Sequence, residues 1–388
     1  MKNLLTLEQE LRKCRRNSCI MEKLFEADFL PIENSSFLYT TPPEIGRIRL
    51  SKVEGLLLGT AIGDVLGNKY ESLIPDQKSP LAPIASFHPN AHITDDTQLS
   101  FIKLEVLLSE GWFNPEVLAK RIVKERIIGI GHSVKTFIRK FKDLKYPWFV
   151  SGVKSAGNGG LFLAPIPIPH VHKPSFELWC DTVVTTRLIY WDRLAISSAV
   201  AFMNIVWKCL KMTEPPEEDW WIEEYIKVAR DLEGDSSRYS TRYGEKYSGP
   251  AWYFVEKVLK RALEKRMSVH ELSNSIGSGA YLLETVPVTL YILAIRAYNP
   301  VLALLDAVTY TKDSDTIGAI VGYIVGALHG IRGFPGYLVK PLLREKLPRK
   351  YLELLISSEE ILKRGSVEND GIVNGYGFES PKDDDPWM

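Results

Sequence analysis

The sequence lacks an excess of charge of either sign, and it lacks long hydrophobic runs. Its 388 residues include 48 Lys and Arg against 48 Asp and Glu, so the formal net charge is zero. Proteins that bind nucleic acid or anionic membranes normally show a basic excess or patch. The longest apolar run, Ile317 to Leu328, is about half of a membrane span and predicts a buried helix. We therefore expect neither a nucleic-acid partner nor a membrane-spanning segment.

Cysteine is also scarce. The chain has four cysteines, Cys14, Cys19, Cys180 and Cys209, and none forms a CxxC pair. This usage suits a reducing compartment better than a disulfide framework. The first residues turn charged before any apolar run of useful length, which is not the pattern of a signal peptide. We therefore expect a cytoplasmic protein with reduced cysteines.

The histidines do not form a metal-binding set. His170 and His172 flank prolines in one loop, and His88 and His92 bracket another. The sequence contains no HExxH, no GxSxG and no Cys–His pattern. These absences disfavour a zinc enzyme and a Ser-His-Asp hydrolase.

Helical signals dominate what is present. Strand-like alternation is rare, whereas helical periodicity with start and stop signals is frequent. Asn114-Pro115 and Asn299-Pro300 each combine an N-cap with a first-turn proline. The clearest predicted helices cover residues 97–108, 175–188, 192–211, 217–232 and 251–265. We therefore predict an all-α fold that forms one compact globule of many helices; the orthogonal packing of these helices is implied only by the family resemblance described below.

Three regions are expected along the chain. The globule should span residues 51–355, and residues 356–388 should form a C-terminal helix and a loosely ordered polar tail. Residues 1–50 form an extension with an amphipathic stretch that a capping box at Thr6 and Gln9 could start. Its apolar residues include Leu4, Leu7, Leu11 and the exposed candidates Leu24, Phe25, Phe29 and Leu30. The extension either packs on the globule as an extra helix or docks a partner.

Two glycine series are spaced at helical intervals. Gly55, Gly59, Gly63 and Gly67 recur every fourth residue, as do Gly318, Gly322, Gly326 and Gly330. Each helical glycine costs about 1 kcal/mol relative to alanine, so the pattern indicates a packing need. On a helix this spacing lines one face with glycine and lets another backbone approach closely. The two helices are therefore expected to pack centrally and to bring their acidic ends together.

Two acid–threonine tetrads carry the strongest chemical signal. Thr94-Asp95-Asp96-Thr97 and Asp313-Ser314-Asp315-Thr316 each open a predicted helix. One such tetrad is explained by N-capping. Two tetrads with adjacent carboxylates exceed capping needs, and their mutual repulsion calls for a cation. Hard oxygen ligands of this kind suit Mg²⁺ or Mn²⁺, so convergence of the tetrads would make a binuclear site.

Further candidates lie around the tetrads. Asp64 lies in an otherwise apolar helix and Glu71 just beyond it, and either could instead be structural. The glycine-rich segment 155–160 could hold phosphate through free backbone N–H groups, although on its own such a segment is more often a plain turn. Trp148 and Phe149 precede this segment and could stack on a base or pack in the core.

Taken together, these motifs resemble those of the ADP-ribosylglycohydrolases, the enzymes related to dinitrogenase reductase-activating glycohydrolase. The motifs that match in order are Gly63-Asp64-x-x-Gly67 with Glu71, Thr94-Asp95-Asp96-Thr97, Ser155-x-Gly157-Asn158-Gly159, Gly279 to Pro287, and Asp313-x-Asp315-Thr316. The resemblance covers about Ser51 to Gly333. It implies an all-α fold with two Mg²⁺ or Mn²⁺ ions that removes ADP-ribose from modified proteins or small adducts.

The resemblance also implies roles for individual residues. The metal ligands would be Thr94, Asp95, Asp96, Asp313, Asp315 and Thr316. Asp95, Asp96, Asp315 and Glu71 would serve catalysis. Substrate would be held by Ser155, Gly157, Asn158 and Gly159, with Tyr190 and Phe149 nearby.

Three departures from the family pattern bear on substrate choice. Ile189-Tyr190 stands where the family commonly has Thr-His, Phe162-Leu163 replaces Met-Arg, and Thr311-Lys312 replaces Gly-Gly. Two other functions stay open. One is an immunity or inhibitor protein that binds an ADP-ribosyltransferase toxin through residues 1–50. The other is a catalytically dead family member, against which the retention of both tetrads counts.

Overall fold

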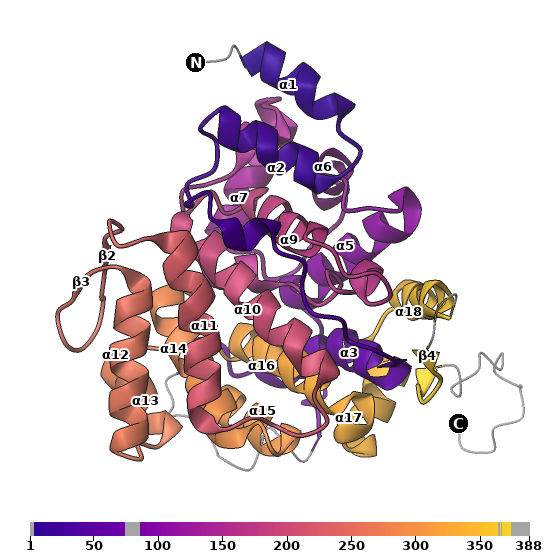
Figure 1. Ribbon diagram of the computed structural model, residues 1–388. Coiled ribbons are helices and arrows are strands. Elements are labelled where there is room, and N and C mark those ends of the chain that lie inside the picture. Colours follow the sequence, from indigo (N-terminus) through magenta and orange to yellow (C-terminus); the bar gives the residue numbers. More distant parts are fainter. Residues whose placement is uncertain (1–3, 74–85, 364, 366, 374–388) are drawn as a thin grey trace, which may run out of the picture.

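Helices build almost all of this computed structural model, which describes residues 4–73, 86–363, 365 and 367–373 (Figure 1). The N-terminal half contains α1 (Leu4–Lys13), α2 (Asn17–Glu26), α3 (Leu50–Gly67), α5 (Asp95–Glu110), α6 (Pro115–Ile122), α7 (His132–Ile138), α8 (Trp148–Ser151), α9 (Glu177–Arg187) and α10 (Arg193–Lys211). The remainder contains α11 (Glu218–Glu233), α12 (Ala251–Glu264), α13 (Val269–Ile276), α14 (Leu282–Arg296), α15 (Pro300–Thr309), α16 (Ser314–His329), α17 (Gly336–Pro341) and α18 (Arg349–Leu362). The all-α prediction is confirmed.

The described residues also contain four two-residue strands and several short 3₁₀ and π segments. β1 (Ile48–Arg49) pairs in parallel with β4 (Val367–Glu368), and β2 (Tyr239–Ser240) pairs antiparallel with β3 (Ser248–Gly249). The β2–β3 hairpin lies between α11 and α12, at the left edge of the view in Figure 1. Its turn residues enter the candidate site described below.

The predicted helix starts are confirmed at their caps. Asn114 Oδ1 accepts hydrogen bonds from Glu116 N and Val117 N at the start of α6. Asn299 caps α15 in the same way, and Asp192 caps α10. Because these caps satisfy N–H groups that have no partner within the helix, they fix where each helix begins.

The two glycine series meet, as predicted, in the centre of the fold. Helices α3 and α16 run antiparallel, with Gly63 facing Gly318 and Gly59 facing Gly322. A Cβ atom added to Gly318 would lie 2.8 Å from the carbonyl oxygen of Gly63, closer than real Cβ atoms come. Gly330 follows the last residue of α16 as its C-cap, with φ +73°, and it still packs on α3, because a Cβ there would lie 2.9 Å from Ser51 Oγ. The pairing places the start of α16 beside the end of α3.

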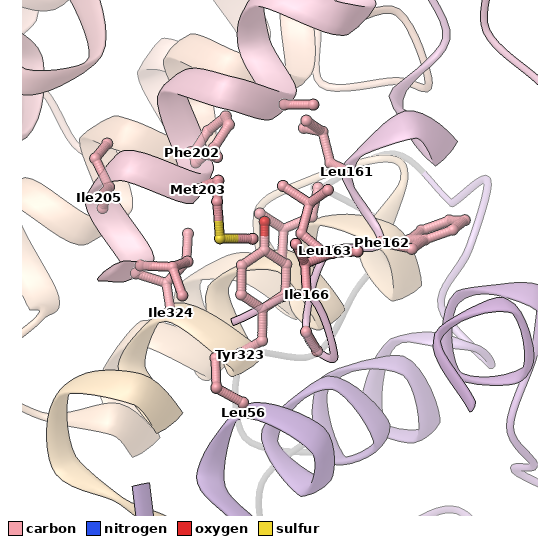
Figure 2. Packing of buried hydrophobic residues seen from close by; sticks show 14 of the residues in the cluster. Leu56, Leu161, Phe162, Leu163, Ile166, Phe202, Met203, Ile205, Tyr323 and Ile324 are labelled. Carbon is pink, nitrogen blue, oxygen red and sulfur yellow. The ribbon is translucent and has the colours of Figure 1, made fainter. Parts of the chain in front are cut away.

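The hydrophobic core surrounds this helix pair. Figure 2 shows Leu56 of α3 and Tyr323 of α16 beside Met203 of α10 and the loop residues Leu161 and Ile166. All of these side chains are buried. Helix α10 is long and apolar enough to cross a membrane, but 89% of that segment is buried within the protein, as expected of a core helix.

The N-terminal extension packs on the globule as α1 and α2. Leu24 and Leu30, which we expected to be exposed, are buried, and Phe29 stacks on Trp191. Asn17 Nδ2 donates to Asp181 Oδ1 of α9 at 2.7 Å. The structure therefore agrees with the first alternative, packing on the globule. The expected exposure of Leu24 and Leu30 was wrong, because α2 packs against α9. The Thr6 capping box is also wrong, since α1 begins at Leu4.

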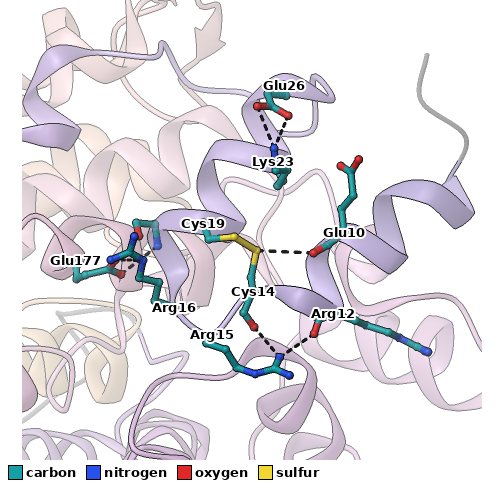
Figure 3. Close-up of a disulfide and its surroundings, with 10 residues drawn as sticks. Glu10, Arg12, Cys14, Arg15, Arg16, Cys19, Lys23, Glu26 and Glu177 are labelled. Atoms are coloured by element: carbon teal, nitrogen blue, oxygen red, sulfur yellow. Dashed lines mark hydrogen bonds and ion pairs between the residues drawn. A yellow bond between two sulfur atoms is a disulfide. The ribbon is translucent and has the colours of Figure 1, made fainter.

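A disulfide joins the two N-terminal helices. Cys14, the residue after α1, is bonded to Cys19 in the first turn of α2 (Figure 3), whereas Cys180 and Cys209 are free and buried. The expectation of reduced cysteines is therefore wrong for the first two. The reason is local: the turn brings their Cα atoms within 5.7 Å, and this five-residue spacing has no recognised sequence signature. The cytoplasmic location stays a prediction.

The segment before the C-terminus is tied to the start of α3. Ile372 N and Val373 N donate to the buried Glu54 carboxylate at 2.8–2.9 Å. Asp370 accepts from Ser51 N and Ser51 Oγ. Loose order was therefore a wrong prediction for residues 367–373. The rest of the predicted tail, 374–388, lies outside the described residues, and α18 crosses the predicted boundary at residue 355.

Candidate metal centre and substrate site

Asp64 organises the start of α5 from the end of α3. It is fully buried, and Thr94 donates to it through both N and Oγ1, each at 2.8 Å. Thr97 also donates to Asp64, from N at 3.2 Å and from Oγ1. These bonds hold the first tetrad against α3. They also give the buried Asp64 carboxylate the hydrogen-bond donors that a buried charge requires.

The second tetrad meets the first at this point. Thr316 Oγ1 donates to Asp96 Oδ2 at 3.3 Å across 220 residues of sequence. Thr94 Oγ1 lies 3.2 Å from the same Asp96 oxygen. The meeting follows from the antiparallel glycine helices, because the end of α3 carries Asp64 and the start of α16 carries Asp315.

The carboxylates form two groups that share one member. One oxygen from each of Asp64, Asp96 and Asp315 lies within 4.8 Å of the others, and the same holds for Glu71, Asp313 and Asp315. Because Asp315 belongs to both groups, the two groups are adjacent. Asp95 belongs to neither and lies beside the turn at Gly129, where a Cβ would come 2.9 Å from its Oδ1.

Electrostatics at this centre favour a bound cation. Burial and the neighbouring acids raise the pKa of Asp96 and of Asp315 well above the ordinary range. The pKa of Asp95 rises to about 7, chiefly through burial and then through Asp64. Asp96 Oδ1 is buried and has no hydrogen-bond partner. A buried carboxylate oxygen without a donor, among repelling acids, fits a divalent metal with hard oxygen ligands.

The glycine-rich segment reaches the acidic centre through Asn158. Its Nδ2 donates to Asp313 Oδ2 at 2.7 Å and to Thr285 Oγ1 at 3.0 Å. Its backbone N donates to Ala280 O, and Gly157 pairs with Tyr281. The predicted phosphate loop is therefore held between the start of α14 and the start of α16.

Tyr190 lies against this glycine-rich segment. A Cβ on Gly157 would come 3.3 Å from Tyr190 Cε1, and one on Gly159 would overlap the Tyr190 hydroxyl. Burial raises the pKa of Tyr190, and Asp95 and Asp96 add to the rise, which places this ring near the acids. The glycines here are thus explained by the close approach of an aromatic ring.

Phe149 does not join the predicted site residues. It is fully buried, and its ring makes edge contacts with Phe29 and Trp148. It exposes no surface on which a base could stack. Sequence alone could not separate these two alternatives, because an aromatic residue before a glycine loop serves either purpose.

A cavity of about 470 Å³ opens beside Glu71 and Asp313. Its wall includes Arg242 and Tyr243 from the β2–β3 turn, together with Glu284 and Lys312. Arg242 was not predicted as a site residue, because no neighbouring motif in the sequence indicates a substrate site. A larger cavity of about 650 Å³ lies beside α1 and α6 and contains none of the clustered carboxylates.

Comparison with known proteins decides the family. The sequence model of the ADP-ribosylglycohydrolase family matches residues 46–369. The chain belongs to the ADP-ribosylglycohydrolase family. It is 23% identical to human ADP-ribosylhydrolase ARH3 over 346 residues, which cover 78% of this chain and 94% of the relative.

Two further similarities extend this result. ADP-ribosylarginine hydrolase Tri1 of Pseudomonas putida is 23% identical over 303 residues, covering 74% of this chain and 72% of the relative. The solved structure of an ADP-ribosylglycohydrolase-related protein complex matches with a TM-score of 0.60 and 21% identity, covering 82% of this chain and 99% of that chain. The structural match supports the fold. Sequence identities this low leave the acceptor to be inferred from the site.

Proposed function

We propose that this protein is a metal-dependent hydrolase that removes ADP-ribose from a modified acceptor by cleaving the bond at the anomeric carbon of the ribose. The observation that carries the proposal is the convergence of the two acid–threonine tetrads at one buried centre beside the glycine-rich segment. Family membership supports the same reaction, since relatives include ADP-ribosylhydrolase ARH3 and ADP-ribosylarginine hydrolase Tri1.

The first tetrad would supply metal ligands through Thr94, Asp95 and Asp96, and the second through Asp313, Asp315 and Thr316. Two adjacent carboxylate groups that share Asp315 suit two ions, Mg²⁺ or Mn²⁺. When bound, such ions polarise ribose hydroxyls and lower the pKa of water. The orphaned Asp96 Oδ1 would gain a partner in that state.

The remaining residues would orient the substrate and move its protons. Glu71 lies beside Asp313, and its pKa is raised by partial burial and then by Asp313. A raised pKa favours the protonated form, which suits a donor to the departing acceptor. The N–H groups around Ser155, Gly157 and Gly159 would receive the pyrophosphate. Asn158 would hold this loop at the metal centre through its bond to Asp313.

Tyr190 would support the loop in place of the histidine common in the family. Phe149 would not contact the substrate, because it is buried in the core. The apolar residues of α2 are used in packing, so we do not extend the proposal to a transferase partner either.

The test is release of free ADP-ribose from peptides modified on arginine or on serine, in Mg²⁺ and in EDTA. We expect Mg²⁺-dependent release from at least one linkage. The same release in EDTA, or none from either peptide in Mg²⁺ or Mn²⁺, would contradict the proposal. Asp143→Asn provides a control, since Asp143 is an exposed carboxylate outside the acidic centre.

A further inference from the structure

The wall of the cavity of about 470 Å³ beside the acidic centre includes two cationic side chains, Arg242 and Lys312. Glu71 and Asp313 belong to the same wall and also to the clustered carboxylates. Arg242 comes from the β2–β3 turn, and Lys312 is the residue before the second tetrad. The cavity wall therefore combines two acids of the candidate reaction centre with two exposed cations.

These two cations are available to a ligand. Neither Arg242 nor Lys312 forms an ion pair within residues 4–73 and 86–363; Arg242 lies 4.3 Å from the centre of the Tyr281 ring. Both lower the pKa of Glu284, so both lie near that carboxylate, although burial raises its pKa overall. Glu284 Oε2 accepts from Gly279 N at 2.9 Å, and Glu284 Oε1 is buried without a hydrogen-bond partner, so neither oxygen is bonded to either cation.

The backbone under Lys312 is held in place. Lys312 N donates to Ser278 Oγ at 2.9 Å, and Lys312 O accepts from Ser72 N at 2.9 Å. At this position the resemblance to the family predicts glycine, which has no side chain. The lysine thus adds a charged side chain to the cavity wall at this position.

Charges of both signs line the cavity. The acids that belong to the carboxylate cluster would be balanced by the metal ions, whereas Arg242 and Lys312 have only Glu284 near them. The acceptor leaves from the anomeric carbon beside the clustered acids, so the groups that flank its modified atom would lie along this wall. Exposed cations there attract negative charge and repel positive charge.

We propose that Arg242 and Lys312 select acceptors that carry negative charge beside the ADP-ribosylated atom, such as a modified residue flanked by Asp or Glu. This inference rests on the proposed function and names the acceptor class for the same site. The two side chains act on the acceptor, so ADP-ribose alone should not depend on them.

The test compares two ADP-ribosylated peptides that share the modified residue and differ only in two acidic or two neutral flanking residues. We expect wild-type kcat/KM to be roughly tenfold higher for the acidic peptide at low salt, with the ratio falling as salt screens the charges. In Arg242→Gln/Lys312→Gln the ratio should fall below about twofold. The exposed Lys246, on the same hairpin outside the cavity wall, provides Lys246→Gln as a control that keeps the preference.

Affinity for free ADP-ribose separates this role from nucleotide binding. We expect the double variant to bind ADP-ribose within about twofold of wild type. A wild-type enzyme that cleaves both peptides equally would overturn the inference while leaving the proposed function intact. If the double variant lost affinity for free ADP-ribose as strongly as it lost activity on the acidic peptide, the inference would also be overturned, because the two cations would then hold the pyrophosphate. Cleavage of neither peptide would contradict the proposed function itself.

Discussion

Asn158 and Asp313, 155 residues apart in sequence, are joined by a 2.7 Å hydrogen bond from Asn158 Nδ2 to Asp313 Oδ2. The bond links the glycine-rich segment to the second acid tetrad. Both groups are buried, so the bond is shielded from water. It makes the geometry of the candidate phosphate loop depend on the same carboxylate that belongs to the acidic centre.

Asn158→Ala should therefore weaken ADP-ribose binding. The substitution removes the donor to Asp313 and to Thr285, and it leaves a buried carboxylate oxygen without that partner. We expect the dissociation constant for ADP-ribose in Mg²⁺ to rise about 10- to 100-fold, measured by calorimetry, with the far-ultraviolet circular dichroism unchanged. Wild-type affinity in this variant would show that the loop does not hold the ligand.

Asp315→Asn should abolish hydrolysis without unfolding the protein. Asp315 is shared by both carboxylate groups, so we expect kcat/KM to fall roughly 10³-fold or more. The amide keeps the size of the side chain and removes one of several repelling charges. The melting temperature in EDTA should consequently be equal to or above that of wild type, and Mg²⁺ should no longer raise it. Turnover at the wild-type rate would mean that Asp315 serves only the helix start.

Gly322→Ala should destabilise the protein although alanine is the better helix former. A Cβ at this position would overlap the carbonyl oxygen of Gly59 on α3. We expect a loss of about 2–3 kcal/mol in the free energy of unfolding, because backbone cannot give way as a side chain can. Gly131→Ala is the matched control, since a Cβ there meets nothing within 4 Å. Equal unfolding midpoints in urea for the two variants would refute the close packing of α3 and α16.

Lys103 should make stability depend on pH above neutrality. Its side chain is buried in α5 and donates to Phe162 O at 2.6 Å, and burial lowers its pKa to about 7. In the unfolded chain the pKa returns to about 10.4. Between these pH values Lys103 binds more protons in the unfolded state than in the folded state. The free energy of unfolding should therefore increase as the pH rises from about 7 to 10.

Lys103→Met should remove this component. The stability of wild type minus that of the variant should increase by about 1 kcal/mol per pH unit between pH 7.5 and 9.5. Urea unfolding at three pH values measures the difference directly. Parallel curves for the two proteins would mean that Lys103 keeps its charge in the fold through contacts other than Phe162.

The sequence was most informative where several signals coincide. The caps at Asn114 and Asn299 and the glycine series of α3 and α16 each combine local propensity with a tertiary requirement, so helix positions and the central packing could be predicted. The tetrads came together because that packing fixes the ends of the two helices. Local sequence did not reveal the burial of Leu24 in α2, the disulfide between Cys14 and Cys19, or the position of Arg242 in the cavity wall.

Tyr190 is a second case in which the sequence did not predict a contact. Its place in the sequence marked a departure from the family pattern, but its packing against Gly157 and Gly159 became visible only in the structure. A substituted residue can therefore support a loop through shape even where the polar contact expected from relatives is missing.

Calorimetric titration of the protein with ADP-ribose in Mg²⁺ and in EDTA tests the proposed metal centre most directly. We predict binding in Mg²⁺ that weakens at least about tenfold in EDTA, and a similar loss in Asp96→Asn, because Asp96 Oδ1 is buried without a hydrogen-bond partner at this centre. Asp143→Asn should behave as wild type. Equal affinity in both buffers, unchanged by Asp96→Asn, would show that the converging tetrads do not form a metal centre for ADP-ribose and would contradict the central claim.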